Sequence, residues 1–187
     1  MIARDTLLDL FWSLSDGDTP LNAFQRVLLM TDGTVTDVVE VYTGEAIRVV
    51  KLAQFFGGND PENPQLSAEG GETLLHRTVL LQGAKSGTNY IHAHSVIAPD
   101  RLPPEVLEGL VETGRPIGKL LASSRIETFR EIVGLGFEPA GDCADYFGVD
   151  PASNLVFRTY RIHVQQRPVM RITEKFPTSW FGLGASF

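Results

Sequence analysis

Two ionisable side chains occur inside segments that are otherwise typical of buried strands. Arg77 lies in a run of leucine, valine and threonine at 74–81, and Glu174 lies in a similar run at 169–176. Because side chains alternate between the two faces of a strand, both residues fall on the apolar face of their segment. A buried charge is costly unless it is paired. The two residues therefore predict either a structural ion pair inside a sheet or a site for a charged ligand.

An arginine and a glutamate together suit a site that binds an anion and transfers a proton. Arginine holds a planar carboxylate through two parallel hydrogen bonds, and a glutamic acid in an apolar wall can act as an acid near neutrality. Two helix starts would add backbone N–H donors for the same anion, one at Gly33-Thr34-Val35 and one at Pro116-Ile117-Gly118. At the first of them, Asp37 lies three residues after Thr34, which resembles a capping box.

Histidine and cysteine give weaker signals. His92 and His94 form a His-x-His pair on one face of a predicted strand, but a metal site needs a third ligand, so we expect no metal. These histidines would instead line a cavity or the outer face, and His94 could contact an acidic ligand. The single cysteine, Cys143, lies between Asp142 and Asp145, which would raise its pKa, so we interpret it as an incidental thiol.

The length and the net charge of the chain limit the class of protein it can be. The 187 residues fit one domain spanning 1–187, and a net charge of -7 argues against nucleic-acid binding through bulk positive charge. No stretch approaches the ~20 apolar residues of a membrane span, and the first residues do not form a signal peptide. We therefore expect a cytoplasmic protein that works on a small molecule, as a monomer or a dimer.

The elements that must position these residues follow from hydrophobic periodicity. Helices are predicted at 5–14, about 20–30, 34–44, 104–112 and 117–121, and strands at 46–56, 73–82, 88–98, 124–133, 154–164 and 168–176. We expect a loop or flap at 57–71 and a mobile tail at 178–187. Helices followed by hairpin-connected strands predict an α+β fold with an antiparallel sheet of about six strands and flanking helices.

Seven segments, in order from about residue 21 to residue 177, are similar to the chorismate pyruvate-lyase family. The resemblance is to its bacterial branch that makes 4-hydroxybenzoate outside ubiquinone synthesis. Each motif alone is weak, but the seven in this order are specific. The segments are LLMTDGTVT at 28–36, HRTVLLQG at 76–83, AHSVI at 93–97, PIGKLL at 116–121, RIETFRE at 125–131, RTYRI at 158–162 and ITEKFP at 172–177.

The resemblance implies a six-stranded sheet with a product pocket closed by flaps. It also implies cleavage of chorismate to 4-hydroxybenzoate and pyruvate without a cofactor. Arg77 matches the arginine that holds the aromatic carboxylate, and Glu174 matches the glutamate beside the 4-hydroxyl. Val35 and Ile117, the latter followed by Gly118, match positions whose backbone N–H groups bind the ligand.

One position departs from the family pattern, because His94 stands where better-known lyases carry an arginine. A histidine can donate to a carboxylate, but its charge changes near pH ~6.5. Two other functions stay open: a same-fold enzyme acting on another substrate in natural-product biosynthesis, and a non-catalytic module that binds an aromatic acid. Further arginines would either favour a dianionic substrate or pair with the glutamates at 127 and 131; they are Arg125, Arg130, Arg158 and Arg161.

Overall fold

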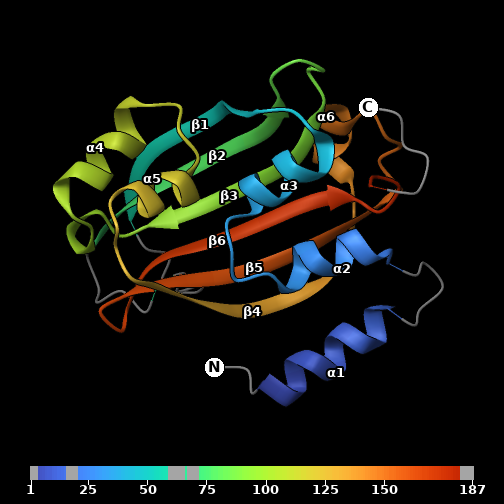
Figure 1. Ribbon diagram of the computed structural model, residues 1–187, viewed down its shortest axis with the longest axis horizontal. Helices are drawn as coiled ribbons and strands as arrows, with labels where there is room; N and C mark the ends of the chain where they lie inside the picture. Colours follow the sequence, from blue (N-terminus) through green and yellow to red (C-terminus); the bar gives the residue numbers. More distant parts are fainter. Residues whose placement is uncertain (1–3, 16–20, 59–65, 67–71, 182–187) are drawn as a thin grey trace.

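The computed structural model describes residues 4–15, 21–58, 66 and 72–181. Six strands among these residues form one antiparallel sheet in the order β1-β2-β3-β6-β5-β4 (Figure 1), which confirms the predicted α+β fold. The strands are β1 (Ile47–Gly58), β2 (Thr73–Gly83), β3 (Asn89–Ile97), β4 (Thr128–Pro139), β5 (Asn154–Val164) and β6 (Arg167–Pro177).

The sheet consists of two three-stranded meanders. Strands β1, β2 and β3 pair in sequence order, and β4, β5 and β6 do the same. The two meanders join where residues 92–97 of β3 pair with residues 170–175 of β6. The last strand in the sequence therefore lies in the middle of the sheet.

Most helices cover one face of this sheet, which we call the front face (Figure 1). The front-face helices are α2 (Ala23–Met30), α3 (Val35–Thr43), α4 (Pro104–Glu112) and α5 (Ile117–Ser123). Helix α1 (Arg4–Ser15) packs beside β4, and the short α6 (Ala144–Phe147) follows β4 near one end of β3. The opposite side of the sheet is the back face.

Two apolar clusters fill the space between the front face and its helices. One joins α2 and α3 to one end of the sheet through Leu28, Leu29, Val35, Val39, Leu81, Ile91, Val156 and Phe176. The other joins α4 and α5 to the opposite end through Val106, Leu110, Leu120, Leu121, Leu75, Ile97, Met170 and Ile172. Burying such side chains stabilises a fold by roughly 1.5–3 kcal/mol each. The two helix starts singled out by the sequence meet between the clusters.

The helix boundaries follow from capping chemistry. Helix α2 begins after Asn22, whose side chain and that of Gln25 form a reciprocal capping box with two 2.9 Å hydrogen bonds. Helix α3 begins after Thr34 and ends at Gly44, which has a φ of 69°. The capping box predicted at Thr34 is wrong, because its side chain makes no capping hydrogen bond.

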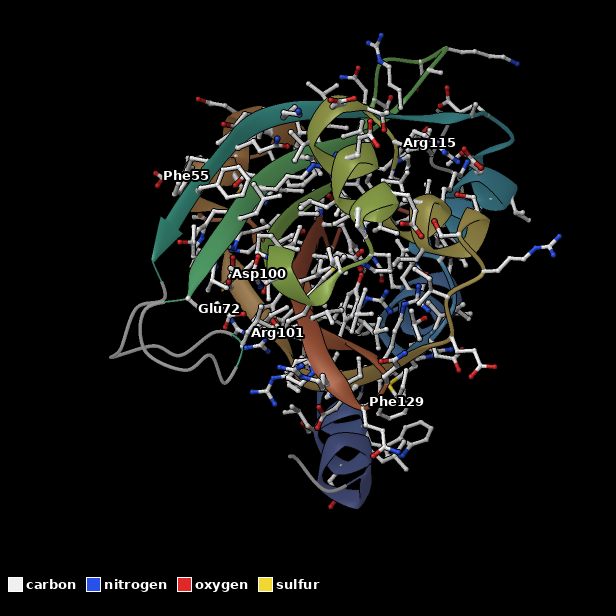
Figure 2. All side chains as sticks on the ribbon, turned by 90° about the vertical axis from the view of Figure 1, so that its left-hand side faces the viewer. Phe55, Glu72, Asp100, Arg101, Arg115 and Phe129 are labelled. Atoms are coloured by element: carbon white, nitrogen blue, oxygen red, sulfur yellow. The ribbon has the colours of Figure 1, made fainter. Side chains whose placement is uncertain are left out.

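A 3-10 turn, η1 (Pro99–Arg101), fastens the end of β3 to its neighbours. Arg101 forms an ion pair with Glu72 at 2.6 Å and donates to the carbonyl oxygen of Pro168 at 2.7 Å. Figure 2 shows Glu72 and Arg101 together at one end of the sheet, with Phe55 on the β1 edge and Phe129 on the β4 side. These contacts fix the ends of β2 and β6, the strands that carry Arg77 and Glu174.

One carboxylate organises the β2–β3 turn. Glu45 accepts hydrogen bonds from the backbone N–H of Lys85 and Ser86 at 2.8 and 3.0 Å, and from the hydroxyls of Ser86 and Tyr90 at 2.6 and 2.7 Å. The hydrogen bonds from Ser86 are the main cause that lowers the pKa of Glu45 to about 2. The ionised side chain therefore holds the turn against the segment that leads into β1.

We expect Glu45→Gln to lower the melting temperature at neutral pH, because the neutral amide accepts weaker hydrogen bonds. Since the folded-state pKa lies below the ordinary value, the stabilisation is complete above about pH 4.5 and is lost as pH falls through about 2. Melting curves of both proteins between pH 2 and 7 check this. A gap in melting temperature that stays constant over this range would contradict it.

Several predicted boundaries need correction. The strand predicted at 124–133 begins at Thr128 and continues to Pro139. Strand β1 extends to Gly58, so the first two residues of the flap predicted at 57–71 belong to a strand. Most of the remaining residues of that segment lie outside the described residues. The described part of the predicted tail ends at the buried Phe181, and 182–187 lie outside the described residues. No helix in the described part of the chain is long and apolar enough to cross a membrane.

Candidate active site

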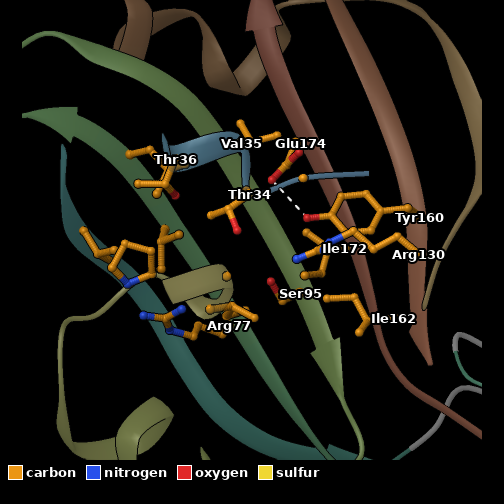
Figure 3. A pocket seen from close by; sticks show the side chains of 18 residues that line it. Thr34, Val35, Thr36, Arg77, Ser95, Arg130, Tyr160, Ile162, Ile172 and Glu174 are labelled. Carbon is orange, nitrogen blue, oxygen red and sulfur yellow. Dashed lines mark hydrogen bonds between the residues drawn. The ribbon is translucent and has the colours of Figure 1, made fainter. Parts of the chain in front are cut away.

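A cleft opens on the front face between the starts of α3 and α5 (Figure 3). The cleft holds about 500 Å³ of empty space, a volume that includes its open mouth. Its main polar and charged side chains are Thr34, Thr36, Arg77, Ser95, Arg130, Tyr160 and Glu174.

Arg77 lies at one wall of the cleft with its charge uncompensated. Its side chain is 1% exposed, and no acidic residue in the described part of the chain pairs with it. The Nη2 atom donates a long 3.4 Å hydrogen bond to the carbonyl oxygen of Arg115, while Nε has no partner among the described residues. Burial lowers the pKa of Arg77, but an arginine stays protonated in proteins. A buried guanidinium in this state is able to bind an anion.

Glu174 lies at the other end of the cleft and has two partners of its own. Arg158 donates from Nε to Glu174 Oε2 at 2.7 Å. The Tyr160 hydroxyl donates to Oε1 at 3.1 Å, the bond that is dashed in Figure 3. Arg158 also donates to the carbonyl oxygen of Thr31 at 2.8 Å. All three side chains are at most 7% exposed. Glu174 therefore belongs to a buried network and does not pair with Arg77.

The charges in this network stabilise one another. Burial is the largest single influence on the pKa of Arg158 and acts to lower it, but the charges and hydrogen bonds of Glu174 and Tyr160 together raise that pKa. Burial first, and the Glu174 charge second, raise the pKa of Tyr160. Tyr160 therefore keeps its proton at neutral pH, and its hydroxyl donates a hydrogen bond to Glu174. The carboxylate keeps acceptor lone pairs that can face the cleft.

The two helix starts meet at the mouth of the cleft. Val35 and Ile117 are the first residues of α3 and α5, whose first N–H groups have no partner within the helix. A Cβ on Gly118 would lie 2.5 Å from Thr34 Cγ2, so only glycine allows this approach. Lys119 Nζ bonds Glu40 at 2.7 Å and thereby ties α5 to α3.

The structure does not bring His94 to the cleft. Strand alternation directs Ala93 and Ser95 to the front face, so His94 lies on the back face, where its ring centre is 6.2 Å from that of His76. Burial, followed by the charges of His76 and Arg171, lowers the pKa of His94. The expectation that His94 contacts the substrate is therefore corrected, because the sheet separates it from the cleft. No group of three metal-ligating side chains occurs in the described ranges.

Sequence reasoning left Arg130 and Arg158 undecided between a dianionic substrate and ion pairs with Glu127 and Glu131, and it missed Tyr160 and the pairing of Arg158 with Glu174. In the segment from Val156 to Ile162, every second side chain points to the same face of the strand, so Arg158 and Tyr160 share the front face with Ile162. The rule that singled out Arg77 would therefore have found Arg158 as well. Arg130 also reaches the cleft, where its Nη1 donates to the carbonyl oxygen of Asp32 at 2.7 Å.

Comparison with solved structures defines the class of fold. The effector domain of PhnF from Mycobacterium smegmatis matches with a TM-score of 0.61 and 16% identity, over 79% of this chain and 90% of that domain. A second PhnF structure contains more of that protein, and there the matched region covers 65% of the PhnF chain. The sheet and its one-sided helices are therefore the chorismate-lyase-like fold that such effector domains share.

Sequence comparison defines the family within that fold. The model of the Rv2949c-like chorismate pyruvate-lyases matches residues 29–181. The chain is 38% identical over 158 residues to the chorismate pyruvate-lyase of Mycobacterium leprae. This match covers 83% of this chain and 75% of the relative. It is 32% identical over 168 residues to the chorismate pyruvate-lyase of Mycobacterium tuberculosis, and this match covers 86% of this chain and 83% of the relative. The chain belongs to the Rv2949c-like chorismate pyruvate-lyase family.

Proposed function

We propose that this protein is a lyase that converts chorismate into 4-hydroxybenzoate and pyruvate. The observation that carries the proposal is Arg77, a buried arginine without an acidic partner among the described residues, in a cleft whose other end holds Glu174. The ring carboxylate of chorismate would supply the missing counter-charge. The names of the relatives at 38% and 32% identity support the same activity.

Each end of the cleft has its own task in this proposal. Arg77 binds the ring carboxylate through its guanidinium fork, and the N–H groups of Val35 and Ile117 add donors. Glu174 faces the hydroxyl-bearing ring carbon, accepts the hydroxyl hydrogen bond and handles the proton that this carbon loses. Arg158 and Tyr160 fix both carboxylate oxygens of Glu174, so the acceptor is already oriented when the substrate enters.

The reaction balances within the substrate. The ether bond between the ring and the enolpyruvyl group breaks, and its electron pair leaves with the oxygen. The ring carbon that bears the hydroxyl loses its proton, and that electron pair completes the aromatic ring. A proton on the methylene carbon converts the departing group into pyruvate. No oxidant, reductant or water is consumed, so aromatisation drives the reaction without a cofactor.

The assay for this proposal follows both products. Purified protein is mixed with chorismate, and 4-hydroxybenzoate and pyruvate are quantified against a protein-free sample that measures spontaneous decay. We expect equal amounts of both products, at a rate proportional to the protein concentration. A folded protein that produces neither would refute the proposal. In that case, tight binding of 4-hydroxybenzoate without turnover would favour a non-catalytic ligand-binding module.

A further inference from the structure

A second uncompensated arginine enters the cleft from the other half of the sheet. Arg130 lies on β4, and Figure 3 shows its side chain reaching into the cleft beside Tyr160 and above Ser95. Its Nη1 donates a 2.7 Å hydrogen bond to the backbone carbonyl oxygen of Asp32, its one hydrogen bond within the described part of the chain. That bond holds the guanidinium in place and leaves its other donors available.

The alternative role for Arg130, an ion pair with a neighbouring glutamate, does not occur in the described residues. Glu131 is next in sequence but points to the back face, where it contacts His163 at 3.0 Å and Arg161 at 3.8 Å. The same alternation that turns Glu131 away turns Arg130 toward the cleft. Arg130 is therefore positioned for the contents of the cleft.

The balance of charge in the cleft then indicates what it accepts. Arg158 and Glu174 neutralise each other at 2.7 Å. Arg77 and Arg130 remain, two positive charges on different walls without an acidic partner in the part of the chain that the structure describes. Two separated guanidinium groups match a ligand with two separated carboxylates. A monocarboxylate would leave one of the two charges unmatched.

We propose that Arg130 binds the second carboxylate of the substrate, the one on its three-carbon ether side chain, and so makes the site selective for dicarboxylates. This inference rests on the proposed function, because it uses the orientation in which Arg77 holds the ring carboxylate. It also explains product release: 4-hydroxybenzoate has only the ring carboxylate, so it makes no contact with Arg130 once the side chain has left.

A binding experiment tests this without turnover. The probes are 3-(carboxymethoxy)-4-hydroxybenzoate, which carries an ether-linked second carboxylate, and 3-methoxy-4-hydroxybenzoate, which lacks it. We expect the wild-type protein to bind the dicarboxylate about 10- to 100-fold more tightly, as a charge-assisted hydrogen bond allows. In Arg130→Gln the two affinities should agree within about threefold, while binding of the monocarboxylate stays unchanged.

Two further variants serve as controls. Arg125→Gln removes the same charge from an exposed residue near the start of β4, and it should keep the full preference for the dicarboxylate. Arg130→Lys keeps the charge and should retain part of the preference, which separates ligand binding from a folding defect. Equal binding of both probes by wild-type protein, or an unchanged preference in Arg130→Gln, would overturn the inference.

Kinetics separate this inference from the proposed function. With chorismate as substrate, Arg130→Gln should raise KM about 10- to 100-fold, and the affinity for 4-hydroxybenzoate should not change. If wild-type protein turns over chorismate and Arg130→Gln has an unchanged KM, the inference fails and the proposed function stands. If wild-type protein does not turn over chorismate, the proposed function fails, and the probe pair still decides whether Arg130 selects dicarboxylates.

Discussion

Replacing Arg77 by methionine is expected to remove almost all activity and, at the same time, to make the protein more stable. Activity falls because the variant loses the counter-charge of the ring carboxylate. Removing one member of a buried, hydrogen-bonded charge pair costs ~2–5 kcal/mol, so kcat/KM should fall by about two to three orders of magnitude. Product formation from chorismate measures this loss.

Stability rises because the unliganded protein buries a charge that nothing in the described residues neutralises. Methionine fills a similar volume without that cost, so the free energy of unfolding should increase by about 1–3 kcal/mol. Urea unfolding without ligand gives this value. Arg48→Met, at an exposed position on β1, is the matched control and should change neither quantity. Retained activity in Arg77→Met would exclude Arg77 from the site, and a loss of stability would mean that it has a structural partner.

The second large effect concerns the ion pair beneath the cleft. Arg158→Met leaves the Glu174 carboxylate buried without its 2.7 Å partner, which should reduce the free energy of unfolding by about 3–5 kcal/mol. Activity should fall as well, because Glu174 loses its fixed orientation. Unfolding curves and chorismate turnover measure the two losses.

The double variant Arg158→Met with Glu174→Gln separates a lost pair from lost packing. Because the second substitution removes the stranded charge, the double variant should be more stable than Arg158→Met alone. It should nevertheless remain inactive, since the acceptor carboxylate is gone. Losses in stability that simply add would show that the two side chains are not coupled.

Alternation along strands was enough to predict which residues point into the site from β2 and β6. It placed Arg77 and Glu174 on the apolar face, and the structure has both on the front face beside the cleft. It also carries enough information to place Arg158 there. The partner of Glu174 could not be predicted, because β5 pairs with β6 in a register that sequence spacing alone does not fix.

Two glycines lie where the fourth strand differs from its prediction. The predicted strand ends at residue 133, yet β4 continues through Gly134 and Gly136 to Pro139. A Cβ on Gly136 would lie 2.8 Å from the ring of Phe157 on β5, so glycine here accommodates a neighbouring ring within the sheet. Such a requirement belongs to the tertiary structure and is not visible in local composition.

The central position of β6 has a consequence for how the site comes into being. Arg77 lies in the first meander, while Arg130, Arg158, Tyr160 and Glu174 all lie in the second. Each meander can form from local hairpins, but the β3–β6 pairing that joins them is distant in sequence and is slow to form for that reason. The complete cleft therefore requires both meanders, because its two ends come from different halves of the sheet.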